Sequence, residues 1–133
     1  MTGERDLRVL IGSMQPVLYD DPYGFACLPI GKTPPAGIFA TVAEDEGLTL
    51  IARASVLRAA GIDPGPAFAR ISLTVHSALE AVGLTAAFSG ALAAEEISAN
   101  VVAGVHHDHV FVGWDDRDRA VAALLALSRA AGA

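Results

Sequence analysis

The apolar positions of the chain recur in two rhythms, one typical of helices and one typical of strands. Apolar residues three or four positions apart form a stripe at Leu7, Leu10, Ile11 and Met14, and the same spacing returns over 84–92 and 120–128. From Ala69 to His76, apolar and polar residues instead alternate one by one, which gives a strand with one buried and one polar face. The pattern therefore predicts a protein that mixes helices and strands.

Turn residues divide the first part of the chain into short elements. Strands are expected over 23–29, 38–42 and 48–52, the last two joined by the turn at residues 44–47. A short helix over 56–60 should follow, with Ser55 as its N-cap and Gly61 as the left-handed residue that ends it. The first part of the chain thus has the order helix, three strands, helix.

The second part repeats a similar set of elements after the strong break at Asp63–Pro66. The alternating strand over 69–76 leads to a helix that opens near Leu84. A strand over 97–105, a turn at His107-Asp108 and a return strand over 109–114 form a hairpin. A last helix follows, capped by Asp115 or Asp116.

These orders predict an α+β fold with antiparallel sheets and helices on one face. The boundary is placed to give an N-terminal half over 1–65 and a C-terminal half over 66–133. Because neither half alone holds a full set of strands, each is expected to complete the sheet of the other.

Charge and cysteine content narrow the class of partner. The formal net charge of −6 and the pI near 5.0 disfavour nucleic acid and anionic membrane surfaces. A single cysteine, Cys27, forms no internal disulfide and is expected to be a small buried hydrophobe in a reducing cytoplasm. The N-terminal residues contain no apolar stretch of the kind found in a secretion signal.

Two long blocks carry a resemblance to a known family. Residues 73–87 read LTVHSALEAVGLTAA, and residues 97–112 read ISANVVAGVHHDHVFV. Together they resemble short bacterial ACT-domain proteins related to the regulatory domains of aspartate kinase. The resemblance implies two ACT-like halves of the ferredoxin-like βαββαβ fold that bind a small molecule, most often an amino acid, and regulate another protein.

The residues of these blocks can form a binding site by their own chemistry. A loop that ends at Gly83 and opens a helix presents unpaired N–H groups at the positive end of the helix dipole, which suits a carboxylate. The amide of Asn100 can both donate and accept hydrogen bonds. The resemblance implies ligand contacts at Glu80, Val82, Gly83 and Asn100, with Glu80 able to meet an ammonium group. The full expected ligand site comprises His76, Ser77, Glu80, Val82, Gly83, Leu84 and Asn100.

Other interpretations of these residues stay open. Gly83 can simply allow a tight turn, Asn100 can bond to a strand edge or a dimer partner, and Glu80 can be a solvated carboxylate. The cluster of His106, His107, His109 and Asp108 suggests a metal site, but neighbouring side chains of a hairpin point to opposite faces. The alternatives to a ligand sensor are thus a metal-binding protein and a purely structural interaction module.

No catalytic motif is recognisable in the chain. It lacks a G-x-S-x-G sequence and a phosphate-binding glycine loop of known spacing. His76 and Ser77 are adjacent in the sequence, but adjacency does not place a base and a nucleophile in the required contact. We therefore expect a cytoplasmic regulatory protein with no cofactor and no enzymatic activity. It should form a homodimer or higher homo-oligomer by joining sheets, because an exposed strand edge invites pairing.

Overall fold

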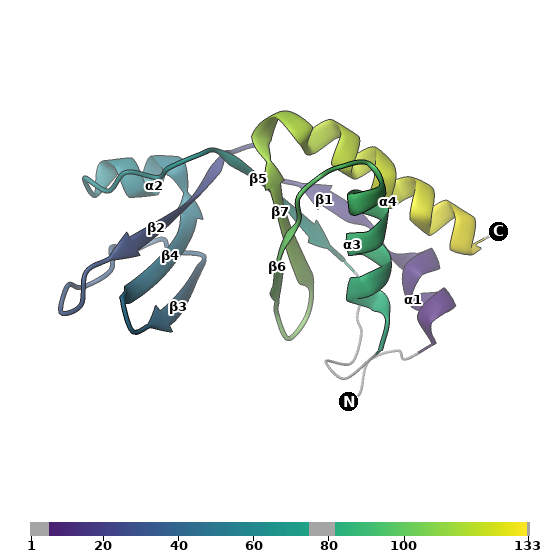
Figure 1. Ribbon diagram of the computed structural model, residues 1–133, viewed down its shortest axis with the longest axis horizontal. Coiled ribbons are helices and arrows are strands. Elements are labelled where there is room, and N and C mark those ends of the chain that lie inside the picture. The colour runs from purple at the N-terminus through teal and green to yellow at the C-terminus, as the bar shows by residue number, and fades with distance from the viewer. Residues whose placement is uncertain (1–5, 75–81, 133) are drawn as a thin grey trace. The chain divides into compact units, whose positions relative to one another are not determined.

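The computed structural model describes residues 6–74 and 82–132 and divides the chain into two compact units (Figure 1). The smaller unit is Asp20–Ala69, and the larger combines the described residues of 1–19 with those of 70–133. The N-terminal segment therefore packs with the C-terminal part of the chain. The expected boundary after residue 65 lies a few residues before Ala69, where the chain leaves the smaller unit and returns to the larger one.

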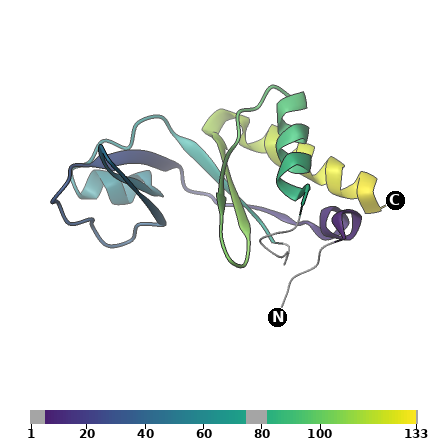
Figure 2. The same ribbon diagram turned by 60° about the horizontal axis from the view of Figure 1, so that its bottom comes forward.

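The larger unit is a four-stranded sheet covered on one face by three helices (Figures 1 and 2). Its strands follow the order β1-β5-β7-β6. The strands are β1 (Pro16–Leu18), β5 (Phe68–Leu73), β6 (Asn100–Ala103) and β7 (Asp108–Gly113), and the helices are α1 (Leu7–Ser13), α3 (Leu84–Ala94) and α4 (Arg117–Gly132), with a 3-10 turn η1 (Trp114–Asp116) before α4.

The N-terminal strand β1 completes this sheet. It runs antiparallel to β5, with Pro16 opposite Leu73 and Leu18 opposite Ile71. The backbone N–H of Thr74 extends the ladder by donating to the carbonyl of Gln15 at 2.9 Å. The prediction that distant parts of the chain complete one another's sheets is confirmed for this unit.

Side chains of the central strands alternate between the helices and the open face of the sheet. Ile71 and Leu73 are fully buried, whereas Val17, which shares a face with their neighbour Ser72, is 43% exposed. The apolar row therefore faces the helices. The core between sheet and helices contains Leu10, Met14, Ile71, Leu73, Phe88, Leu92, Val110, Val112, Ala120 and Leu124.

The smaller unit is a sheet of the order β3-β4-β2 with one short helix. Its elements are β2 (Tyr23–Leu28), β3 (Ala40–Glu44), β4 (Gly47–Arg53) and α2 (Ala54–Ala59). Tyr23 of β2 also pairs with Phe68, where β5 begins. The core of this unit is formed by Leu28, Leu50 and Ala52 together with Leu57 of α2.

The expected helices and strands are all present, but some local details are different. Cys27 is exposed rather than buried, because it lies on the face of β2 opposite the buried Leu28. Ser55 does not cap α2, since the N-cap position is Arg53 and no side chain bonds there. Gly61 does adopt the left-handed conformation, with φ of 75°. Among the described residues, no helix is long and apolar enough to cross a membrane.

Two glycines should respond in opposite directions to replacement by alanine. A Cβ at Gly24 would stand 2.6 Å from the Cβ of Pro64, whereas nothing lies within 4 Å of a Cβ at Gly90 in α3. We expect Gly24→Ala to lower the free energy of unfolding by about 1–3 kcal/mol, the usual cost of overpacking. Gly90→Ala should raise it by about 0.5–1 kcal/mol through helix propensity. Urea denaturation of both variants tests this, and equal effects would contradict it.

Candidate functional site

The start of α3 presents a set of backbone donors. Gly83 has a φ of 99° and supplies no capping side chain, and the first helical bond runs from the N–H of Ala87 to the Gly83 carbonyl at 2.9 Å. The N–H groups of Leu84, Thr85 and Ala86 therefore have no partner within the helix. They lie at the positive end of the helix dipole, where an anion such as a carboxylate is stabilised.

An apolar side chain from α1 borders these donors. A Cβ placed on Gly83 would come within 2.9 Å of Leu7 Cδ2, so the methyl groups of Leu7 lie directly against the glycine. Leu84 points into the core and is 3% exposed, whereas Val82 is 86% exposed. The start of α3 thus combines hydrogen-bond donors with apolar surface. Leu7 was not predicted as a site residue, because a helical stripe in the sequence indicates that α1 is amphipathic but not which segment it contacts.

Contacts at both ends hold α1 in this position. The side chain of Asp6 caps α1 by accepting from the N–H groups of Arg8 and Val9. Near its other end, the hydroxyl of Ser128 in α4 donates to the carbonyl of Gly12 at 3.1 Å. Leu7 is consequently fixed by packing between α1 and α4.

Asn100 lies elsewhere in the same unit. It is exposed, begins β6 and pairs with Phe111, so its side chain is on the sheet face away from the helices, as the alternation predicted. Only residues 95–99 separate it from the end of α3, whereas Gly83 lies at the other end of a helix about 16 Å long. Within one copy of the chain, Asn100 and the start of α3 therefore do not form one site.

The remaining expected ligand residues are His76, Ser77 and Glu80, which lie outside the described residues. Of the seven, the structure thus places Val82, Gly83 and Leu84 together at the start of α3 and Asn100 apart from them.

The histidine hairpin has a structural contact on the open face of the sheet. His109 Nδ1 and Ser72 Oγ lie 2.7 Å apart in a hydrogen bond that links β7 to β5. The rings of His106 and His107 are 6.4 Å apart between centroids. Over residues 6–74 and 82–132, no three His, Cys, Asp or Glu side chains gather in a way that could hold a metal ion.

Burial shifts the pKa values of two hairpin residues in directions that favour their neutral forms. It lowers the pKa of His109 to about 4, and the positive charges of Arg70 and His107 add to this effect. Burial also raises the pKa of Asp108, although His107 partly opposes that shift. His109 is therefore neutral at pH 7.

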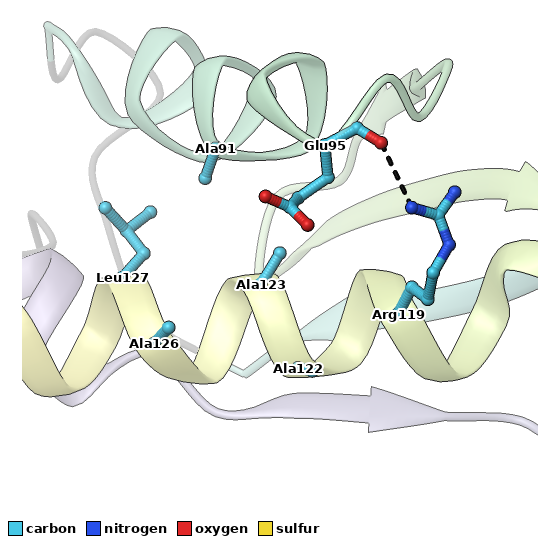
Figure 3. A pocket seen from close by; sticks show the side chains of 7 residues that line it. All are labelled: Ala91, Glu95, Arg119, Ala122, Ala123, Ala126 and Leu127. Carbon is cyan, nitrogen blue, oxygen red and sulfur yellow. Dashed lines mark hydrogen bonds between the residues drawn. The ribbon is translucent and has the colours of Figure 1, made fainter.

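A groove of about 520 Å³ runs between α3 and α4 on the side away from the sheet (Figure 3). Its walls are mostly small apolar side chains, and the two helices run in opposite directions along it. At one end, Arg119 donates to the carbonyl of Glu95 at 3.1 Å and to Asp116 Oδ1 at 3.0 Å. The groove is lined by Ala91, Glu95, Arg119, Ala122, Ala123, Ala126 and Leu127.

Comparison with known proteins agrees with this architecture. The ACT-domain family matches residues 2–69 and, separately, residues 69–126. The chain belongs to the ACT-domain family. ACT domains are regulatory modules, often of the amino-acid-binding kind. No curated protein matches the chain.

Several solved structures resemble this ACT-domain protein. A Vibrio cholerae protein of unknown function, described as a possible transport protein, is 42% identical over 92% of this chain and 95% of its own, with a TM-score of 0.79. An Agrobacterium tumefaciens protein is 19% identical over 86% of this chain and 89% of its own, with a TM-score of 0.70. The ligand-free regulatory subunit of Thermus thermophilus aspartate kinase is 12% identical over 86% of this chain and 98% of its own, with a TM-score of 0.59. The last two likenesses show the ACT fold alone, and they confirm the expected ferredoxin-like architecture.

The shifted pKa of His109 predicts how stability depends on pH. Because the folded pKa of about 4 lies below the unfolded value of about 6.5, the unfolded ACT protein binds more protons between these values. The contribution of His109 to stability is therefore present above pH 6.5 and is lost as the pH falls toward 4. The raised pKa of Asp108 has the opposite effect, because it makes the folded state relatively more stable as the pH falls. Melting temperatures across this range should fall less steeply for His109→Gln than for the wild type. The exposed His106→Gln is the matched control, and an unchanged slope in His109→Gln would contradict the prediction.

Proposed function

We propose that this ACT-domain protein binds an amino acid and regulates another protein, with no catalytic activity of its own. Membership of a family of regulatory modules supports the class of function. The observation that carries the ligand assignment is the start of α3, where Gly83 leaves backbone donors without helical partners beside the apolar Leu7. Donors of this kind suit the carboxylate that every amino acid possesses.

The neighbouring residues suggest how the rest of an amino acid is held. The methyl groups of Leu7 and the exposed side chain of Val82 would contact an apolar part of the ligand. Glu80, which the family resemblance adds to the site together with His76 and Ser77, would meet the ammonium group. No cofactor is needed for this role.

We propose further that Asn100 reaches the ligand of a second copy. β6 is the last strand in the order of its unit, so one of its edges is unpaired within the described residues. Edge strands of this kind pair readily with another chain. If two β6 strands pair antiparallel about a two-fold axis, the first residue of one strand lies beside the last residue of the other.

Such pairing would bring the two parts of the proposed site together. The end of β6 leads into the β6–β7 turn, which lies at the same end of the larger unit as the start of α3 (Figures 1 and 2). Asn100 of one copy would then approach Val82–Leu84 of the other at the rim of the joined sheets. We thus propose that the protein is a cytoplasmic homo-oligomer and that its ligand site is completed when the sheets of two copies pair.

A thermal-melt screen against the amino acids tests the proposed function. A ligand that binds only the folded protein stabilises it by about 2.7 kcal/mol at a hundredfold excess over Kd, so at least one amino acid should raise the melting temperature. Asn100→Ala should remove most of that rise without changing the melting temperature of the free protein. Ser98→Ala, which is also exposed and two residues away, should keep it.

Other outcomes of this screen would contradict the proposal. A response to zinc and chelator but to no amino acid would indicate the metal alternative. A response to neither would indicate an interaction module.

A further inference from the structure

The first strand of the smaller sheet has an open outer edge. β3 begins the order β3-β4-β2, and among the described residues it pairs only with β4 (Figure 1). Its register is unbroken from Ala40 opposite Ile51 to Glu44 opposite Gly47. Residues 41–44 are all exposed. The strand is therefore regular, and the edge away from β4 faces solvent.

Two residues of β3 direct their backbone groups toward this open edge. A two-residue turn separates Glu44 from its partner on β4, and the residues that flank such a turn form a hydrogen-bonded pair. Pairs with and without these hydrogen bonds alternate along an antiparallel ladder. Glu44 and Val42 thus bond to β4, whereas the N–H and C=O groups of Thr41 and Ala43 point outward. These outward groups are in position to continue the ladder to one further strand.

β3 lacks the features that usually prevent pairing at the edge of a sheet. Natural edge strands are protected by Lys or Pro residues, by bulges or by inward-pointing charges. Residues 40–44 read ATVAE, with neither Lys nor Pro, and no extra residue interrupts their register with β4. The β-branched Thr41 and Val42 favour the extended backbone that an added strand requires. The edge is therefore suited to accept an extended segment.

The turn at one end of β3 adds negative charge. Residues 44–46 are Glu, Asp and Glu, and all three are exposed. The Glu44 carboxylate accepts a hydrogen bond from the hydroxyl of Thr49, whereas Asp45 and Glu46 form no ion pair with another described residue. The sequence between residues 33 and 52 contains no Lys or Arg that would balance these charges. Basic side chains on a partner would complement this end of the strand.

We infer that the outer edge of β3 binds an extended, basic segment of the protein that this chain regulates, which adds one strand to the smaller sheet. Main-chain bonds to Thr41 and Ala43 supply affinity, and Lys or Arg side chains lie beside residues 44–46. A second copy brings the same carboxylates and a net charge of −6, so charge favours a different, basic chain. The inference rests on the part of the proposed function that assigns regulation of another protein, and it is independent of the amino-acid site.

A synthetic peptide tests the contact on the full chain. The probe is a short, fluorescently labelled peptide of alternating threonine and valine that begins with a pair of lysines, since an antiparallel partner starts beside the turn. Its anisotropy should rise on binding, and glutamates in place of the lysines should raise Kd about tenfold. The same peptide with methylated backbone nitrogens should not bind. Failure of the lysine peptide to bind, or equal binding of the methylated form, would overturn the inference.

A proline at an outward position tests whether the peptide uses this edge. Ala43→Pro removes an outward N–H but no bond of the β3–β4 ladder, so Kd for the peptide should rise about tenfold while the fold is kept. Ala43→Val retains the N–H and is the matched control. Amide exchange of the wild type gives a second measurement, in which the peptide should slow exchange at Thr41 and Ala43. Unslowed exchange at both residues would contradict the assignment of the edge.

Neutral variants test the choice of a basic partner. Asp45→Asn/Glu46→Gln should raise Kd for the lysine peptide about threefold to tenfold and weaken its dependence on salt. Glu96→Gln/Asp118→Asn removes the same charge from exposed positions of the larger unit and should leave Kd unchanged. Equal effects of the two pairs would mean that the peptide responds only to net charge, and the charge assignment would be wrong.

These results are distinguishable from failure of the amino-acid site. Peptide binding that Ala43→Pro weakens supports the β3 contact even if no amino acid raises the melting temperature. An amino acid that raises the melting temperature of a protein that binds no peptide would overturn the β3 contact and leave the ligand proposal standing. If exchange at Thr41 and Ala43 instead slows with protein concentration alone, a second copy occupies the edge, and the inference of a basic partner is wrong.

Discussion

The antiparallel pairing of β1 with β5 is the interaction on which the larger unit depends. β5 is central in the sheet, with β7 on one side and β1 on the other. The pairing of Pro16–Leu18 with Ile71–Leu73 joins segments more than fifty residues apart in the chain. Without β1, one edge of β5 would lose its backbone partners, and buried strand edges without partners are costly. The sheet of the larger ACT-like unit is therefore completed only when Pro16–Leu18 pairs with β5.

The same pairing places α1 against the start of α3. Because α1 directly precedes β1, fixing that strand restricts where α1 can lie, and the bond from Ser128 to the Gly12 carbonyl fixes it further. Leu7 consequently contacts Gly83, and the candidate ligand site combines residues from both segments of its unit, one before residue 20 and one after residue 69. The integrity of that site is therefore coupled to the stability of the sheet, even though β1 contributes no side chain to it.

Sequence patterns predicted the elements of this fold better than their surroundings. The periodicities of Leu7–Met14 and of Ala69–His76 depend on local backbone geometry, so they identified the helix and the strand directly. Whether Cys27 is buried depends instead on which face of β2 another element covers, and the apolar neighbours of Cys27 do not encode that. The Ser72–His109 bond and the Leu7–Gly83 contact join residues distant in sequence, so neither periodicity nor motif spacing contains a signal for them. The start of α3 was predictable because a glycine before a helix is a local feature.

The distinction between local and long-range contributions also bears on ligand specificity. Backbone N–H groups at the start of α3 recognise a carboxylate whatever side chain the ligand carries, so the part of the proposed site that the ACT blocks encode is generic. Selectivity must come from side chains that meet the rest of the ligand, and Leu7 is such a side chain, although it lies outside both blocks. The methyl groups of Leu7 would leave a polar ligand side chain without hydrogen bonds, which penalises its binding. The α1 helix, rather than the family motif, is therefore where proteins with this site can differ in the amino acid they accept.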